Sequence, residues 1–302
     1  MGGAKVLCVV DMDFSALIGS SRQVLLDGAM GTELERRGVH GGCAANLLAP
    51  SAVLDVHRAY FESGSSVAIT NTLTMNRIFI GSHSLGLDVS KVNQAGARIA
   101  RAAADGKGYV LGNLSSTGQL LEPYGTFTEH QVLDAFREQA VELLEGGVDG
   151  FIIETMIDLR EAACALKACK MESSLPVIVM IAFETEAKGG RTAMGNSVMD
   201  CVALLTQEGA DAIGANCGTV DPLQMAEIIR HFRSLTALPI AAEPNAGRPR
   251  LQSGITQFDM DPLAFARGTA SCVSAGASIV GGCCGTTPEH IRRLASVLMG
   301  CH

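Results

Sequence analysis

The segment Ser-Ile-Val-Gly-Gly-Cys-Cys-Gly-Thr-Thr-Pro (278–288) contains one complete junction between a strand and a helix. Its apolar start at 278–281 is typical of a parallel strand that is covered on both faces. Its end, Thr287-Pro288, places a capping side chain before a proline at the first helical position. Glycines and two cysteines fill the turn between them. The segment therefore predicts a strand, a thiol-bearing turn and a helix in that order.

Seven other apolar runs repeat this pattern, each followed by apolar residues at helical spacing. They lie at 24–27, 67–70, 109–112, 151–154, 177–181, 212–215 and 239–242. Eight such units in roughly 280 residues predict an α/β fold, a (β/α)8 TIM barrel. A doubly wound open sheet is the alternative, but residues 27–32 lack the glycine spacing of a dinucleotide loop. We predict an N-terminal extension over 1–21 and one barrel domain over 22–302.

Composition narrows the class of protein further. The 302 residues carry a net charge of −8 and no basic run longer than two residues, which argues against a nucleic-acid partner. No apolar stretch approaches the roughly 20 residues that span a bilayer, so we expect no membrane partner. The N-terminus lacks the apolar region of a signal peptide, which favours a cytoplasmic protein with free thiols. The oligomeric state stays open.

Ten cysteines are spread along the chain without the spacing of a disulfide framework. Five of them are expected to be packing residues, because free cysteine is often buried. These are Cys8, Cys164, Cys169, Cys201 and Cys272. Cys217 and the pair Cys283-Cys284 stand apart, because each lies just beyond the end of a predicted strand.

Polar residues and thiols follow six of the eight predicted strands, at the end of the barrel where enzymes of this fold place their sites. Strands six, seven and eight are neighbours in a barrel, so Cys217, Asn245 and the Cys283-Cys284 pair should face one small volume. Three thiolates suit Zn²⁺ and leave one coordination position open, as in catalytic zinc sites. Adjacent residues of a regular strand point to opposite faces, but the glycines around the pair permit the strand to break there.

The three cysteines, and two acids at the ends of other predicted strands, also have simpler interpretations. Cys283 and Cys284 fit a pair of packing thiols or a vicinal disulfide, and Cys217 fits a buried residue at a strand end. Asp27 fits the N-cap of the following helix. Glu154 fits an acid that pairs with a nearby Arg or Lys.

Six motifs, in this order, resemble the homocysteine S-methyltransferase family. They are Asp-Gly-Ala-Met-Gly-Thr (27–32), Thr-Asn-Thr (70–72), Glu-Thr (154–155), Asn-Cys-Gly (216–218), Pro-Asn-Ala-Gly (244–247) and Gly-Gly-Cys-Cys-Gly-Thr (281–286). The resemblance runs from about residue 22 to about residue 299. Within the family it is strongest to the N-terminal homocysteine module of cobalamin-dependent methionine synthase.

The resemblance implies a metal centre of defined composition. Cys217, Cys283 and Cys284 match the zinc thiolates of the family. Asn245 matches the residue that can take the fourth position when homocysteine is absent. The implied cofactor is therefore Zn²⁺.

The resemblance also implies how the substrate is held. Asp27, Gly28 and Thr32 match the loop that helps to hold the amino acid, and Glu154 matches the acid that binds its ammonium group. Asp27 and Glu154 are therefore the candidate catalytic and substrate-binding acids. The implied enzyme activates homocysteine as a zinc thiolate and methylates it to methionine.

Members of the family take the methyl group from methylcobalamin, betaine, S-methylmethionine or S-adenosylmethionine. Betaine is disfavoured because quaternary ammonium groups are held by aromatic cages, and the chain has no Trp and three Tyr. With no room for cobalamin and folate domains in 302 residues, methylcobalamin would come on a separate corrinoid protein. A sulfonium donor is the other candidate. Two further functions stay open: a methyltransferase for another thiol in one-carbon catabolism, and a non-catalytic zinc- or thiol-binding regulator.

Overall fold

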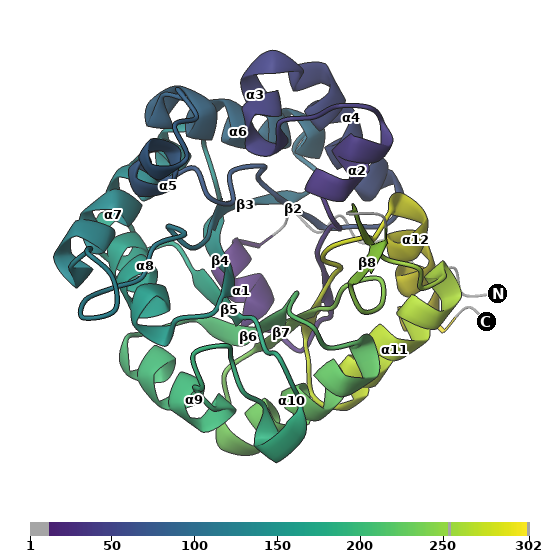
Figure 1. The fold of residues 1–302 in the computed structure, drawn as a ribbon. Helices are drawn as coiled ribbons and strands as arrows, with labels where there is room; N and C mark the ends of the chain where they lie inside the picture. The colour runs from purple at the N-terminus through teal and green to yellow at the C-terminus, as the bar shows by residue number, and fades with distance from the viewer. Residues whose placement is uncertain (1–11, 253–254, 301–302) are drawn as a thin grey trace.

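Eight parallel strands form a ring inside a layer of helices (Figure 1) in the computed structural model, which describes residues 12–252 and 255–300. The sheet order is β1-β10-β7-β6-β5-β4-β3-β2. All eight predicted runs form strands, and the predicted (β/α)8 barrel is confirmed. The strands are β1 (Val24–Leu25), β2 (Val67–Ile69), β3 (Tyr109–Leu114), β4 (Gly150–Met156), β5 (Val177–Ile181), β6 (Ala212–Asn216), β7 (Ile240–Glu243) and β10 (Ile279–Val280).

The helices begin where capping side chains stand in the sequence. Asp221 accepts hydrogen bonds from the backbone N–H groups of Leu223 and Gln224, and Asp261 caps its own helix in the same way. The helices are α1 (Phe14–Ile18), α2 (Gly31–Arg36), α3 (Ala45–Leu48), α4 (Pro50–Glu62), α5 (Arg77–Ser82), α6 (Val89–Ala104), α7 (Glu129–Glu145), α8 (Leu159–Glu172), α9 (Val198–Gln207), α10 (Pro222–Leu235), α11 (Pro262–Ser274) and α12 (Pro288–Leu298).

The barrel closes between β1 and β2 without a regular strand ladder. The backbone N–H of Ser66 donates to the carbonyl of Leu25 at 2.8 Å. Two residues further along the chain, the side chain of Asp27 makes the next hydrogen bond across this gap. Its Oδ2 accepts a hydrogen bond from the backbone N–H of Ile69 at 2.9 Å. The Asp27 carboxylate therefore completes the seam that the backbone leaves open.

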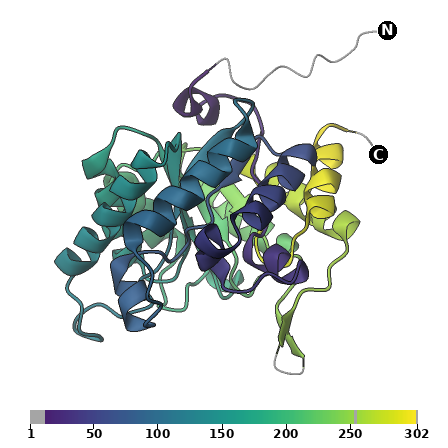
Figure 2. The same cartoon turned by 90° about the horizontal axis from the view of Figure 1, so that it is seen from above.

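Helix α1 covers the N-terminal end of the barrel, opposite the end where the strands finish (Figures 1 and 2). Phe14, Leu17 and Ile18 pack against the side chains that fill the barrel interior, among them Val24, Leu26, Val67, Ile69, Tyr109, Leu111, Ile152, Ile178 and Met180. The helix lies within the predicted extension over 1–21, of which residues 1–11 and with them Cys8 lie outside the described residues. The boundary at residue 22 stays a prediction.

A two-stranded hairpin was not predicted. Strands β8 (Arg250–Gln252) and β9 (Ile255–Gln257) pair antiparallel and project from the connection between β7 and α11 (Figure 2). Each strand has three residues, and Arg, Gln and Thr dominate them. Such a short polar stretch gives no alternating pattern from which a strand could be predicted.

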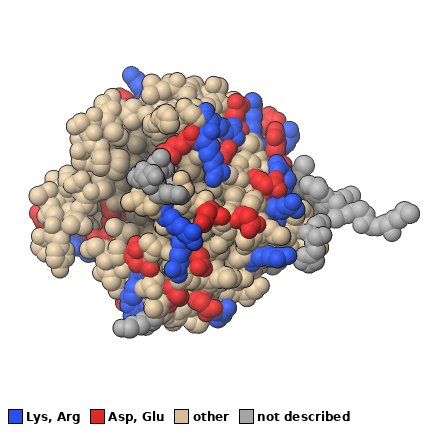
Figure 3. Space-filling model, turned by 45° about the vertical axis from the view of Figure 1, so that its right-hand side comes forward, with Lys and Arg blue, Asp and Glu red and all other residues tan. Residues whose placement is uncertain are grey.

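Charged side chains concentrate on the outer helices. In Figure 3, Lys and Arg alternate with Asp and Glu over the helical side of the barrel, whereas the face that surrounds the hollow at its mouth is mostly uncharged. Within 12–252 and 255–300, no helix is long and apolar enough to cross a membrane. Cys164, Cys169, Cys201 and Cys272 are buried, as predicted for packing residues.

Removal of a side chain from α1 tests its role in closing the barrel. Leu17 is 3% exposed, so Leu17→Ala should lower the free energy of unfolding by about 2–5 kcal/mol through lost burial and a cavity. Ser15 is exposed on the same helix, and Ser15→Ala should change it by less than about 0.5 kcal/mol. Urea denaturation measures both. A Leu17→Ala chain as stable as the wild type would show that α1 does not contribute to the core.

Candidate active site

A cavity of about 570 Å³ opens at the C-terminal ends of the strands. Seven of the eight predicted site residues line it: Asp27, Gly28, Thr32, Glu154, Cys217, Cys283 and Cys284. The eighth, Asn245, is 1% exposed and follows β7 beside them. The fold therefore brings together residues that are up to 257 positions apart, as the barrel prediction requires.

The three thiols form a compact cluster. Their Sγ atoms all lie within 4.8 Å of one another, and Cys217 Sγ lies 3.9 Å from Cys284 Sγ. Cys217 directly follows β6 and adopts a left-handed backbone with φ of 52°, a conformation that non-glycine residues rarely take and that clusters at functional sites. All three are free thiols, which removes the vicinal disulfide as an interpretation of this structure.

The Cys283-Cys284 turn is fastened to the loop that carries Asn245. The backbone N–H of Cys283 donates to the carbonyl of Pro244 at 2.9 Å, and that of Ala246 donates to the carbonyl of Cys284 at 2.9 Å. Strand β10 ends at Val280, so the strand breaks before the pair, as its flanking glycines predict. The two bonds fix the spacing between the pair and Asn245.

The three thiols of the cluster differ in pKa. Hydrogen bonds from the Cys283 and Cys284 thiols lower the pKa of Cys217 to about 3. The same contacts raise the pKa of Cys284 to about 12 and raise that of Cys283 as well. Cys217 is therefore the thiol of the three that ionises most readily. All three sulfurs can ionise together only when a cation offsets their repulsion.

The donor set fits a zinc ion. Tetrahedral coordination with Zn–S bonds of about 2.3 Å places sulfurs about 3.8 Å apart, close to the observed separation of Cys217 and Cys284. Asn245 donates through Nδ2 to the carbonyl of Gly218 at 3.1 Å, whereas its buried Oδ1 has no hydrogen-bond partner among the described residues. An oxygen in that state suits a fourth ligand.

Glu154 lies at the end of β4 and is held from β6. Asn216 Nδ2 donates to Glu154 Oε1 at 3.2 Å and to Thr155 Oγ1 at 3.0 Å, while Asn216 Oδ1 accepts from the backbone N–H of Thr155. Burial raises the pKa of Glu154 to about 7. Glu243 is its neighbour at the end of β7. The pKa of Glu243 is raised well above its ordinary value, mainly because the carboxyl is buried and secondly because Glu154 is an acid beside it.

Asp27 is buried and serves the fold as well as the cavity. Burial raises its pKa, and the neighbouring His57 opposes that rise. His57 is fully buried on α4, with Nδ1 at 3.7 Å from Asp27 Oδ2. The N-cap interpretation of Asp27 is not what the structure shows, because its carboxylate bonds to Ile69 across the barrel seam.

The loop after β1 is tied to the cysteine turn. Thr286 Oγ1 accepts from the backbone N–H of Ala29 at 2.9 Å and donates to the carbonyl of Cys283 at 2.7 Å. Thr32 Oγ1 accepts from the backbone N–H of Gly285. A Cβ at Gly28 would lie 2.7 Å from the Tyr60 ring, so only glycine fits there. Gly28 and Thr32 thus allow the loop to lie against the cysteine turn.

Sequence reasoning missed three residues of this site. Asn216 and Glu243 stand at strand ends, where their position was a usable signal, but no role was predicted for either. His57 lies on a helix among apolar residues and gives no such signal. All three act through burial and three-dimensional contact.

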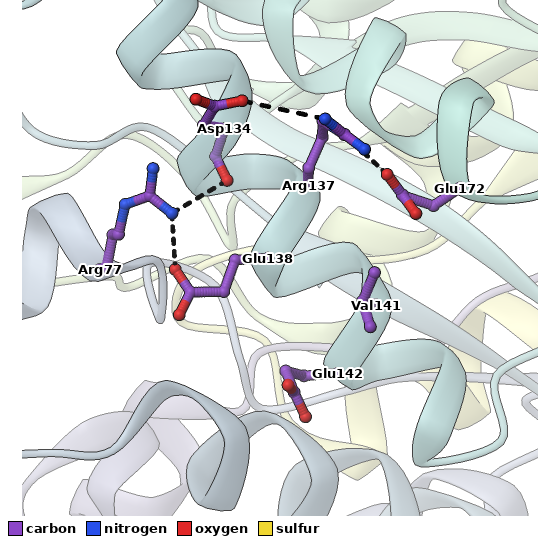
Figure 4. A pocket seen from close by; sticks show the side chains of 7 residues that line it. All are labelled: Arg77, Asp134, Arg137, Glu138, Val141, Glu142 and Glu172. Atoms are coloured by element: carbon purple, nitrogen blue, oxygen red, sulfur yellow. Dashed lines mark hydrogen bonds and ion pairs between the residues drawn. The ribbon is translucent and has the colours of Figure 1, made fainter.

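A second hollow, of about 380 Å³, lies on the outer surface beside α7 (Figure 4). Arg77 pairs with Glu138, Arg137 pairs with Asp134 and Glu172, and Glu142 accepts a hydrogen bond from Gln94. These contacts join neighbouring helices. They give the hollow no group that calls for a ligand.

Comparisons with known proteins agree with this geometry. The homocysteine S-methyltransferase family matches residues 24–298. Methionine synthases from Mycobacterium leprae and Mycobacterium tuberculosis are each 33% identical over 306 and 302 residues, which is 94% and 92% of this chain but 25% of either relative. The chain therefore spans about a quarter of the length of the curated relatives it matches.

A solved structure shares the fold. The homocysteine methyltransferase MmuM from Escherichia coli, in its metallated form, superposes with a TM-score of 0.76 at 24% identity, covering 93% of this chain and 98% of that one. Fold and site together define a barrel enzyme with a thiol cluster at its mouth. The chain belongs to the homocysteine S-methyltransferase family. The predicted family and the predicted barrel are confirmed.

The raised pKa of Glu154 gives the stability a defined pH dependence. The carboxyl titrates near its ordinary value of 4.5 when unfolded and at about 7 when folded, so the folded chain binds the proton more tightly. The free energy of unfolding should fall as the pH rises from about 4.5 to about 7, by roughly 3 kcal/mol at most from this group. Glu154→Gln should lose that part of the fall.

Urea denaturation of the metal-free protein at about pH 5 and about pH 8 measures the difference. Glu145→Gln, which removes an exposed acid from the end of α7, should leave the wild-type fall intact. A Glu154→Gln chain whose stability falls as steeply as the wild type would contradict the assignment.

Proposed function

We propose that this chain transfers a methyl group to the sulfur of homocysteine and forms methionine, with a zinc ion held by Cys217, Cys283, Cys284 and Asn245. The observation that carries the proposal is the cluster of three sulfurs within 4.8 Å in a cavity that also contains buried acids. The membership of the family supports homocysteine as the substrate. The similarity to two methionine synthases supports methionine as the product.

The metal and the acids divide the work. When bound, zinc would lower the pKa of a substrate thiol, so that the nucleophilic thiolate is present at neutral pH. Glu154 and Asp27 would attract the substrate ammonium, because they are acids in a cavity whose described lining contains no Lys or Arg. Gly28 and Thr32 would position the loop that faces the substrate carboxylate.

The methyl donor is proposed to be a methylcorrinoid on a separate protein or a sulfonium compound. Phe79 is the one aromatic side chain among the described residues that line the cavity. A quaternary ammonium donor such as betaine would call for an aromatic cage, which this lining does not supply.

Metal content tests the proposed ligands. Three variants remove one proposed ligand each: Cys217→Ser, Cys283→Ser and Cys284→Ser. Each should bind less than one zinc per chain and lose at least about 100-fold in the rate of methionine formation. Loss of a residue that only orients a metal ligand already costs about 10- to 100-fold in metal affinity or activity, and loss of the ligand itself should cost at least as much. Cys201→Ala, which truncates a buried thiol on α9, should keep one zinc. Plasma emission spectrometry after dialysis gives the stoichiometry.

The same experiment separates the competing functions. Three serine variants that all retain one tightly bound zinc would overturn the thiolate site. A wild-type protein that binds zinc but methylates no thiol with methylcobalamin, S-methylmethionine or S-adenosylmethionine would favour a regulator over an enzyme.

A further inference from the structure

His290, in the first turn of α12, is buried but does not line the cavity. It is 6% exposed, and its ring meets the buried ring of Phe265 on α11 edge to face, with ring centroids 5.4 Å apart. Burial lowers the pKa of the imidazole, so the ring is neutral at pH 7. A neutral imidazole offers one donor and one acceptor, and a buried one is expected to use both.

The partners of the two ring nitrogens fix which of them carries the proton. The backbone N–H of Thr287 donates to Nδ1 at 3.2 Å, so Nδ1 is the acceptor. Nε2 lies 3.0 Å from the carbonyl oxygen of Met260, which can only accept, so Nε2 carries the proton. The ring therefore links the start of α12 to Met260, two residues before α11.

Met260 continues this link to the loop that carries Asn245. The N–H of Met260 donates to the carbonyl of Ala246 at 3.1 Å, and the N–H of Ala246 donates to the carbonyl of Cys284 at 2.9 Å. The chain runs from Cys284 directly into α12, which carries His290. The hydrogen bonds therefore close a circuit between the cysteine turn, the Asn245 loop and α12.

Close packing holds the same segment in place. A Cβ at Gly285 would lie 2.3 Å from the Cβ of Phe258, and a Cβ at Gly247 would lie 3.1 Å from the Cβ of Met260. Phe258 thus lies against the cysteine turn, and Met260 lies against the loop after β7. Residues 258–260 therefore contact both segments that carry proposed metal ligands.

The two segments depend on this circuit to different degrees. The cysteine turn has separate anchors, because Thr286 and Thr32 tie it to the loop after β1. The loop that carries Asn245 leads instead into the β8-β9 hairpin, which projects away from the barrel (Figure 2). Long connections are held less firmly than the elements that they join. Loss of the His290 link should therefore affect Asn245 more than the cysteines.

We propose that His290 is a positioning residue of the metal centre. By holding Met260 against α12, it keeps Asn245 at the distance from the three thiols that a shared zinc ion requires. Residues that orient a metal ligand typically change metal affinity by about 10- to 100-fold. This inference rests on the proposed function, because it assumes a zinc ion bound by Asn245 and the thiols.

Two substitutions separate the helix cap from the link to Met260. His290→Asn keeps an acceptor near the position of Nδ1 but has no donor at Nε2. Asp200, whose side chain is as short, makes the same cap in α9 by accepting from a backbone N–H at 2.7 Å. His290→Gln can keep both bonds, as Gln224 does in α10, where Oε1 accepts from the N-cap N–H and Nε2 donates to Glu186.

Competition with a chromophoric zinc chelator gives the zinc Kd of the full chain. His290→Asn should raise it about 10- to 100-fold, and His290→Gln should raise it less than about threefold. In an Asn245→Ala background, His290→Asn should add less than about threefold, because the ligand that it positions is gone. Gln131→Ala, which removes an exposed capping side chain from α7, should leave the Kd unchanged.

The double variant distinguishes positioning from general damage. An equal rise with and without Asn245 would overturn the role, because a chain damaged as a whole would lose zinc in both backgrounds. A His290→Asn chain that binds zinc as tightly as the wild type, or a His290→Gln chain weakened as much as His290→Asn, would also overturn it. These outcomes leave the methyl transfer standing. A wild-type chain that binds no zinc would overturn the proposed function, and the role of His290 with it.

Discussion

Repulsion between three closely placed sulfurs is the constraint on which the site depends. Cys217 and Cys284 lie 3.9 Å apart, and hydrogen bonds from Cys283 and Cys284 lower the pKa of Cys217 while those of the other two thiols are raised. The fold nevertheless keeps this arrangement. It places Cys217 in a left-handed conformation and fastens the Cys283-Cys284 turn to the loop around Asn245. Such a cost is typical of a site whose geometry is kept for a ligand.

The core of the barrel lies away from the thiol cluster. Helix α1 and the apolar interior supply the core at the N-terminal end, so the C-terminal ends of the strands can carry polar groups. Asp27 shows how closely the two requirements meet, because one carboxylate closes the seam between β1 and β2 and also lines the cavity. Glu154 is held in a comparable way through Asn216, which reaches it from β6. Glu154 is thus positioned within β4, and Asp27 by its hydrogen bond to β2.

The sequence was sufficient for the strands and for the thiols, because continuous apolar runs and paired cysteines are local patterns. It was insufficient wherever the meaning of a residue comes from burial. Glu243 reads as one more acid at a strand end until its carboxyl is found buried beside that of Glu154. Likewise, Asp27 reads as a helix cap until the gap beside β2 is known.

X-ray absorption at the zinc edge tests the central claim most directly, because it counts the sulfur ligands without depending on the methyl donor. The zinc-loaded protein should show three sulfurs and one oxygen or nitrogen, from Cys217, Cys283, Cys284 and Asn245. Addition of homocysteine should convert this to four sulfurs. A spectrum that starts with fewer than three sulfurs, or that does not change when homocysteine is added, would contradict the account.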